Sequence, residues 1–148
     1  MKNIEIFEAI SGLLLADLYQ YFPLKMKVQP NEYALRLDDG HWSECLVGEK
    51  YIRNRSPAAM TKPTIEWLAS AGYISYDNYD GEYFDGVTLT AKGLETIRSD
   101  KSMAEQLIAA AQDVTKSELK NIAREKIRQI MSDMLAKGIK YGWGYIIN

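Results

Sequence analysis

The side chains best suited to bind a metal or to act as a nucleophile are His41 and Cys45, which stand four residues apart. That spacing would place both on one face of a helix. Zinc sites commonly use four ligands from clustered Cys and His pairs, and the chain has no second Cys or His. We therefore expect no Cys/His metal site, and we interpret Cys45 as a buried structural thiol.

A second group of possible ligands surrounds the pair Asp80-Gly81, where Asp77 and Glu82 add two more carboxylates. An EF-hand needs oxygen ligands at alternate positions and a Glu at position twelve, and the spacing of Asp77 and Asp80 does not fit. We interpret the segment as a solvated turn. The sequence also lacks a P-loop and a GxGxxG motif, so we predict no enzyme, no cofactor and no metal.

Basic residues form the one pattern that suits nucleic acid. Several lie just before or inside a helix predicted over 61–71, and in helix-turn-helix proteins such a helix enters the major groove. Lysine and arginine would contact phosphates, and threonine would contact the backbone or base edges. A scattered, solvated face is the alternative interpretation. The candidate contacts to double-stranded DNA are Lys50, Arg53, Arg55, Thr61, Lys62 and Thr64.

The helix over 61–71 is predicted from its ends and its apolar face. Thr61 is expected as the N-cap, with Pro63 in the first turn, where a missing N–H costs little. The apolar residues that share one face are Ile65, Leu68 and Ala69, with Trp67 beside them. Gly72 is expected to end the helix because glycine accepts positive φ.

A hairpin and a second helix follow. Residues 73–76 are rich in aromatic and β-branched types, which favour a strand. Asp80-Gly81 predicts a two-residue hairpin turn, and the return strand would end at 87–90. Thr90 is then expected to cap a helix that directs Leu94 and Ile97 toward the core.

This order resembles the back half of the MarR-like and PadR-like winged-helix regulators. In those families the recognition helix ends in Leu-x-x-x-Gly-aliphatic, matched by Leu68 to Tyr73, and the wing exits through Leu-Thr-x-x-Gly-x-x-x-Leu/Ile, matched by Leu89 to Ile97. The run Tyr19 to Pro23 is similar to small bacterial and phage-associated winged-helix proteins. The resemblance implies an α+β winged helix-turn-helix core with additional N- and C-terminal helices, and a dimeric transcription regulator that binds DNA.

Two features depart from that family pattern. The wing, residues 77–86, carries Asp77, Asp80, Glu82 and Asp85 and no basic residue, and carboxylates are repelled by phosphate. Residues 40–56 are poorly helical in pattern, although a helix is needed shortly before 61. The alternative is a winged-helix interaction module that does not bind DNA. Its aromatic anchors would be Tyr76, Tyr79, Tyr83 and Phe84, unless these rings pack across the hairpin.

The remaining helices are predicted from periodicity and capping boxes. Residues 4–22 form an apolar-faced helix that includes Tyr21 and Phe22. Residues 30–37 fit a short helix, and a strand over 33–37 fits nearly as well. Capping boxes at 102–105 and 115–118 predict two further helices, the second over 116–136 and ended by Gly138. The glycine-aromatic tail, 141–147, is expected as a short strand or a docking segment.

Composition sets the outer limits. The chain has 148 residues, one cysteine and a net charge of −2, which fits a single domain in a reducing, cytoplasmic compartment. We expect a winged-helix domain over 1–100 and a helical extension over 101–148. Residues 116–148 are basic and residues 1–115 are acidic, which suggests either self-complementary packing or an anionic partner. We also expect self-association through helices 4–22 and 116–136, and no interaction with a membrane.

Overall fold

The computed structural model of the chain describes residues 3–38, 57–116 and 118–147. These residues form an α+β fold with six helices and a small antiparallel sheet of four strands. The elements are α1 (Asn3–Tyr21), β1 (Met26–Val28), α2 (Pro30–Leu37), α3 (Pro57–Ser70), β2 (Ile74–Ser75), β3 (Asn78–Tyr79), β4 (Phe84–Leu89), α4 (Ala91–Arg98), α5 (Lys101–Asp113) and α6 (Lys120–Ile147).

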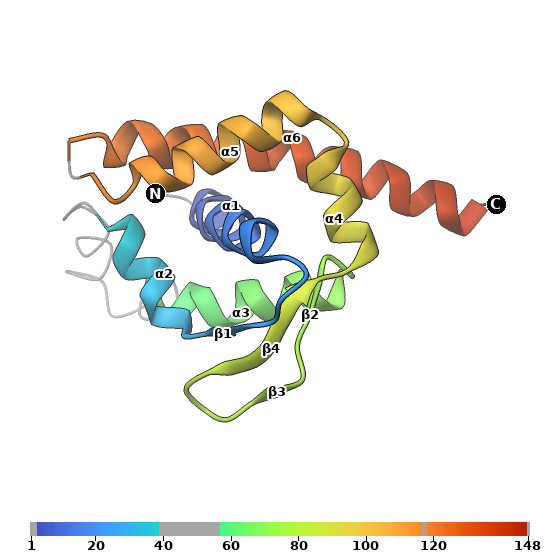
Figure 1. The fold of residues 1–148 in the computed structure, drawn as a ribbon, viewed down its shortest axis with the longest axis horizontal. Coiled ribbons are helices and arrows are strands. Elements are labelled where there is room, and N and C mark those ends of the chain that lie inside the picture. Colours follow the sequence, from blue (N-terminus) through green and yellow to red (C-terminus); the bar gives the residue numbers. More distant parts are fainter. Residues whose placement is uncertain (1–2, 39–56, 117, 148) are drawn as a thin grey trace.

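Helix α1 lies at the centre of the molecule. Figure 1 shows it between α5 and α6 on one side and α2, α3 and the sheet on the other. Ile10, Leu13 and Ser11 point in different directions around the helix, yet all three are fully buried, as expected of a helix enclosed on every side. The predicted helix over 4–22 is confirmed, although Tyr21 and Phe22 are exposed rather than part of the core.

Helix α6 covers α1 with the apolar face that the sequence predicts. Its buried residues are Ala123, Ile127, Ile130, Met131, Met134 and Leu135. The predicted ends are wrong. Thr115 is not the cap, because its hydroxyl donates to the carbonyl of Gln112 at 2.8 Å, and the helix runs through Gly138 to Ile147. The face predicted to pair with another chain therefore packs inside this one.

The start of α5 also differs from the prediction. Its N-cap is Asp100, whose side chain accepts from the backbone N–H of Met103 at 3.0 Å. Ser102, the expected cap, lies one residue inside the helix and accepts from Gln106. An aspartate two residues upstream offers a carboxylate to the free amides, so the helix begins there.

The basic side chains of α6 contact the acidic body of the same chain. Arg128 lies 3.4 Å from the carboxylate of Glu8 and 3.8 Å from that of Glu5. Arg124, which is buried, donates to the carbonyl of Leu37 at 3.0 Å, and Lys120 donates to that of Asp38. Cations stabilise the carbonyl end of a helix, here α2. The interpretation of self-complementary packing is therefore supported.

Helix α2 resolves the choice between helix and strand. Pro30 lies at its first turn, where a missing N–H is tolerated. Asp17 of α1 accepts from the Tyr33 hydroxyl at 2.9 Å and lies 2.5 Å from the Arg36 guanidinium. Burial, followed by the nearby Asp17 carboxylate, raises the pKa of the Tyr33 phenol. These bonds hold α2 against α1.

Helix α3 begins earlier than predicted. It starts at Pro57, so Thr61 lies inside the helix with a fully buried side chain and does not cap it. Pro63 is likewise internal, where it has no N–H to donate. The predicted end is confirmed: Gly72 has φ 87°, its N–H donates to Ala69, and that of Tyr73 donates to Leu68. This pair of bonds is a Schellman motif.

The sheet has the strand order β1-β4-β2, and β3 also pairs with β4. The turn after β3 is wider than the predicted two-residue type, because Tyr79 and Phe84 are partners across residues 80–83. Gly81 has positive φ and Asp80 does not; Asp80 instead accepts from two backbone amides. Thr90 caps α4 as predicted, accepting from the N–H of Gly93.

One hydrophobic core joins both predicted parts of the chain. Ile10 and Ile65, from the first hundred residues, belong to the same cluster as Leu107 and Ile127 of the C-terminal helices. No helix within the described residues is long and apolar enough to cross a lipid bilayer.

The crossing of α1 and α6 generates a first prediction. A Cβ at Gly12 would lie 2.3 Å from Cγ2 of Ile127 and 2.6 Å from Cγ of Met131. We expect Gly12→Ala to lower the free energy of unfolding by about 1–3 kcal/mol through overpacking, despite the better helix propensity of alanine. Denaturant unfolding measures this change.

A double-mutant cycle with Ile127→Ala provides the control. The cost of Gly12→Ala should shrink in that background, because the truncated side chain leaves room for the new methyl group. An unchanged or stabilised Gly12→Ala protein would contradict the close helix contact.

Candidate functional site

The outer face of α3 is the principal candidate site. Lys62, Pro63, Glu66 and Trp67 are exposed along it, whereas Thr64 on the inner side is 2% exposed. The Thr64 hydroxyl donates to the carbonyl of Met60 at 2.7 Å. Buried hydroxyls cannot reach a nucleic acid, so the prediction that Thr61 and Thr64 contact DNA is wrong for this conformation.

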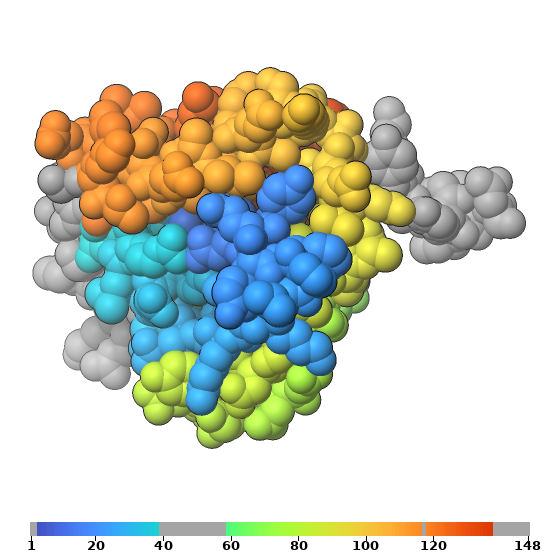
Figure 2. All heavy atoms as spheres, in the orientation of Figure 1, coloured from blue at the N-terminus to red at the C-terminus, as the bar shows by residue number. Residues whose placement is uncertain are grey.

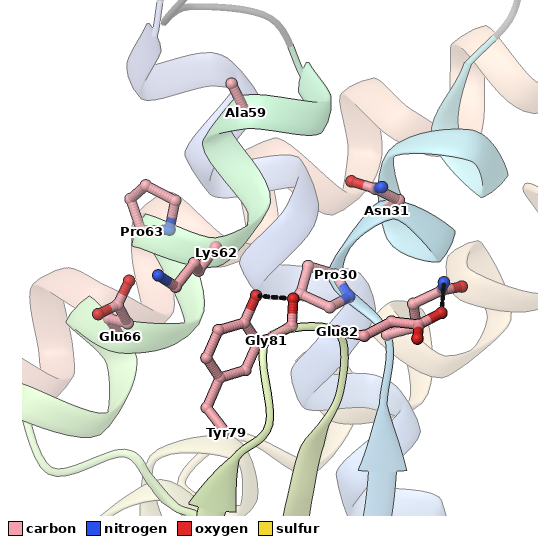
Figure 3. A pocket seen from close by; sticks show the side chains of 10 residues that line it. Pro30, Asn31, Ala59, Lys62, Pro63, Glu66, Tyr79, Gly81 and Glu82 are labelled. Atoms are coloured by element: carbon pink, nitrogen blue, oxygen red, sulfur yellow. Dashed lines mark hydrogen bonds between the residues drawn. The ribbon is translucent and has the colours of Figure 1, made fainter.

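Lys62 joins α3 to the hairpin. Its ammonium lies 4.8 Å from the centre of the Tyr79 ring, within the range of a cation–π interaction. The Tyr79 hydroxyl donates to the carbonyl of Gly81 at 3.0 Å, which fixes the ring. In Figure 3, Lys62 of α3 and Tyr79 of the hairpin border the same groove. The structure thus brings together one predicted DNA contact and one predicted interaction anchor.

A groove of about 420 Å³ lies between α3, the start of α2 and the hairpin. Lys62 and Glu66 border it from α3, Asn31 from α2 and Glu82 from the hairpin (Figure 3). The wall combines one cation with two carboxylates, so its charge does not favour an anionic ligand.

An apolar depression of about 330 Å³ lies on the other side of the same face. Ile4 and Phe7 of α1 and Met60, Pro63 and Trp67 of α3 line it. The Trp67 ring packs edge-on against Phe7 at 5.1 Å and stacks on Tyr73 at 6.2 Å, yet 43% of Trp67 stays exposed. A rigid, partly exposed tryptophan is typical of an interaction surface.

Lys27 of β1 and Lys25, which directly precedes the strand, compensate part of the acidic hairpin. Lys25 lies 3.3 Å from Asp77 and Lys27 lies 3.8 Å from Asp85, and Lys27 also sits over the Tyr83 ring at 4.7 Å. In Figure 2 the blue segment that carries β1 lies against the yellow-green hairpin. Sequence reasoning missed these lysines. The alternation of charged and apolar residues over 25–28 is the signal that could have found the strand.

The hairpin aromatics mostly pack against one another. Phe84 is fully buried, with Tyr76 edge-on at 4.8 Å and Tyr79 at 4.4 Å. Phe84 is therefore a core residue and cannot anchor a partner. The alternative interpretation, cross-strand packing, applies to Tyr76, Tyr79 and Phe84, while Tyr83 stays partly exposed beside Lys27.

The other predicted site residues lie outside the part of the chain that the structure describes. These are Lys50, Arg53 and Arg55, and also His41 and Cys45. Among the described residues, no group of three or more His, Cys, Asp or Glu side chains is arranged to hold a metal ion.

Comparisons with protein-family models, with curated proteins and with solved structures find no match for this chain. What the protein does is therefore inferred from the residues that α3 and the hairpin bring together.

The hairpin turn generates a second prediction. The N–H groups of Tyr83 and Glu82 donate to Asp80 at 2.7 and 2.9 Å and lower the pKa of this carboxyl below 3.8. We expect an NMR titration of the Asp80 carboxyl carbon to have its midpoint below that value. Because the folded-state pKa is the lower one, the turn is stabilised at neutral pH and loses this contribution as pH falls through the folded-state pKa.

Asp80→Asn is the matched variant, because it keeps an acceptor oxygen and removes the charge. The turn should persist in this variant, without the pH dependence that Asp80 contributes. A midpoint at or above 3.8 in the wild-type protein would contradict the bonded turn.

Proposed function

We propose that this protein is a non-enzymatic winged-helix interaction module whose outer α3 face binds a protein partner. The observation that carries the proposal is the chemistry of that face, where Pro63 and the exposed Trp67 border an apolar depression. Interfaces between proteins are enriched in aromatic anchors and depleted of charge at their centre.

The order of elements supports the winged-helix assignment. Helix α1, a short strand, helices α2 and α3 and then a hairpin follow one another, and β1 pairs with the return strand β4. The part of this succession from α3 through the hairpin to α4 is the one that the resemblance to MarR-like and PadR-like regulators implies. In such an arrangement α3 is the exposed recognition helix and the hairpin over 74–89 is the wing.

The distribution of charge favours a protein partner over DNA. The described outer face of α3 offers one cation, Lys62, and one carboxylate, Glu66. Two wing carboxylates, Asp80 and Glu82, have no ion-pair partner among the described residues. Since attraction between basic residues and phosphate supplies most non-specific affinity for DNA, this surface is poorly suited to a duplex.

Sequence-specific DNA binding is the second candidate function, as in a transcriptional regulator. The observation that favours it is the placement of α3 at the surface beside the hairpin, with Lys62 on its outer side. Lys50, Arg53 and Arg55 precede α3 in the sequence and would grip phosphates in that case.

An electrophoretic shift assay with random duplex DNA at about 50 mM salt, where electrostatic binding is strong, separates the two functions. We expect the wild-type protein to give no shift at concentrations up to about 10 µM. This concentration is sufficient for the test, because DNA-binding proteins already bind non-specific DNA in this range at higher salt.

A matched set of variants tests which residues cause any shift that does occur. Replacing Lys50, Arg53 and Arg55 together by alanine should abolish it if the basic segment grips phosphates, and Lys62→Glu should do the same if α3 enters the groove. Lys101→Glu on α5 is the control, because this exposed lysine is remote in sequence from α3. A shift that is lost in the first two variants and kept in the control would establish DNA binding and end the interaction-module proposal.

A further inference from the structure

We propose that the partner of the α3 face is a second copy of this chain, with the two α3 helices packed antiparallel about a two-fold axis. This inference rests on the proposed function, since it names the partner of the same surface. In a two-fold interface each residue meets its counterpart reciprocally, so the surface must be complementary to itself.

The charges on α3 satisfy that condition. Lys62 and Glu66 lie one helical turn apart on the exposed face, and an antiparallel arrangement centred between them places Lys62 against Glu66 of the partner subunit, twice. Neither residue has an ion-pair partner among those described. Within one helix, an ion pair in which the lysine lies four residues before the glutamate is weaker than a pair in the reverse order.

Apolar groups lie between and beside the two charged side chains on the α3 face. Pro63 lies between the two charges along the helix, and Trp67 and Ile4, 43% and 57% exposed, border the adjoining depression. A two-fold axis through this face would bring the two depressions together. Charged groups around an apolar centre are the usual arrangement of a protein interface.

Tyr79 prepares Lys62 for such a contact. A lysine side chain loses considerable rotamer entropy when it is fixed at an interface, and here the Tyr79 ring already holds the ammonium at 4.8 Å. The hairpin therefore acts as a positioning element for the charge on α3, although the Tyr79 ring itself is only partly exposed.

The size of the surface sets the expected strength. Stable interfaces bury about 800 Å² on each partner, and we expect a contact centred on one helix face to bury less than that. We therefore expect a weak dimer with a Kd of about 10–100 µM at low salt. The dimer would cover α3 and block its entry into a DNA groove.

Sedimentation equilibrium of the full chain at about 5–300 µM, a range that brackets the expected Kd, tests the inference. Lys62→Glu and Glu66→Lys should each weaken association at least about tenfold, because each creates two like-charge contacts. The double variant K62E/E66K should associate at least about threefold more tightly than either single variant, because the reversed pair is again complementary, but more weakly than wild type, because Tyr79 no longer holds the lysine. Lys101→Glu is the control and should not alter association.

Thermal melts of every variant exclude a folding defect, since Lys62 and Glu66 are exposed and loss of the Lys62–Tyr79 contact should lower Tm by no more than about 4 °C. A wild-type protein that is monomeric throughout, or a double variant that fails to recover, would overturn the inference. A monomer that gives no DNA shift would overturn the dimer alone, whereas a monomer that shifts DNA would overturn the interaction module as well.

Discussion

The fold depends on covering α1 from every side. A helix that is apolar around its whole circumference cannot lie at a surface, and α1 buries Ile10, Leu13 and Ser11 in different directions. The sheet, α2 and α3 cover one side, and α5 and α6 cover the other (Figure 1). The C-terminal helices are therefore part of the core of this chain, and Gly12 lets α6 approach α1 closely.

Polar contacts fix how the elements around α1 are arranged. Arg128 links α6 to two carboxylates of α1, and Arg124 binds the carbonyl end of α2. The Arg128 pairs are partly exposed and contribute modestly, whereas the buried Arg124 guanidinium would lose a hydrogen-bond partner if α2 shifted. Such contacts therefore select one register of α6 on α1 and α2, while the apolar core supplies most of the stability.

The elements predicted correctly are those whose signals are local and strong. The length and apolarity of α1, the positive φ of Gly72 and the cap at Thr90 all hold. Three predicted helix starts are wrong, because a Ser or Thr before an apolar run does not by itself identify the residue that caps the helix. Ala58, Ala59 and Met60 extend α3 upstream of Thr61, Asp100 replaces Ser102, and Thr115 bonds back to α5.

The site was predicted less well than the fold, for a related reason. Helix α3 begins at Pro57, four residues before Thr61. The residues that were expected to form its exposed first turn therefore lie inside the helix. The side chains of Thr61 and Thr64 then face the core. Lys25 and Lys27 were missed because their partners lie about fifty residues away in sequence, as for Lys25 and Asp77, and no local pattern encodes such a contact.

What the outer face of α3 can bind depends on Glu66 as much as on Lys62. A lysine over a tyrosine ring suits a phosphate, a carboxylate or a solvated surface equally. One turn further on, Glu66 would oppose a phosphate backbone, and unfavourable charge contacts are what exclude wrong partners at an interface. The same glutamate becomes favourable when the opposing surface carries Lys62 in the reversed direction. A single pair of side chains thus disfavours DNA and favours a second copy of the chain, provided that two α3 helices meet antiparallel.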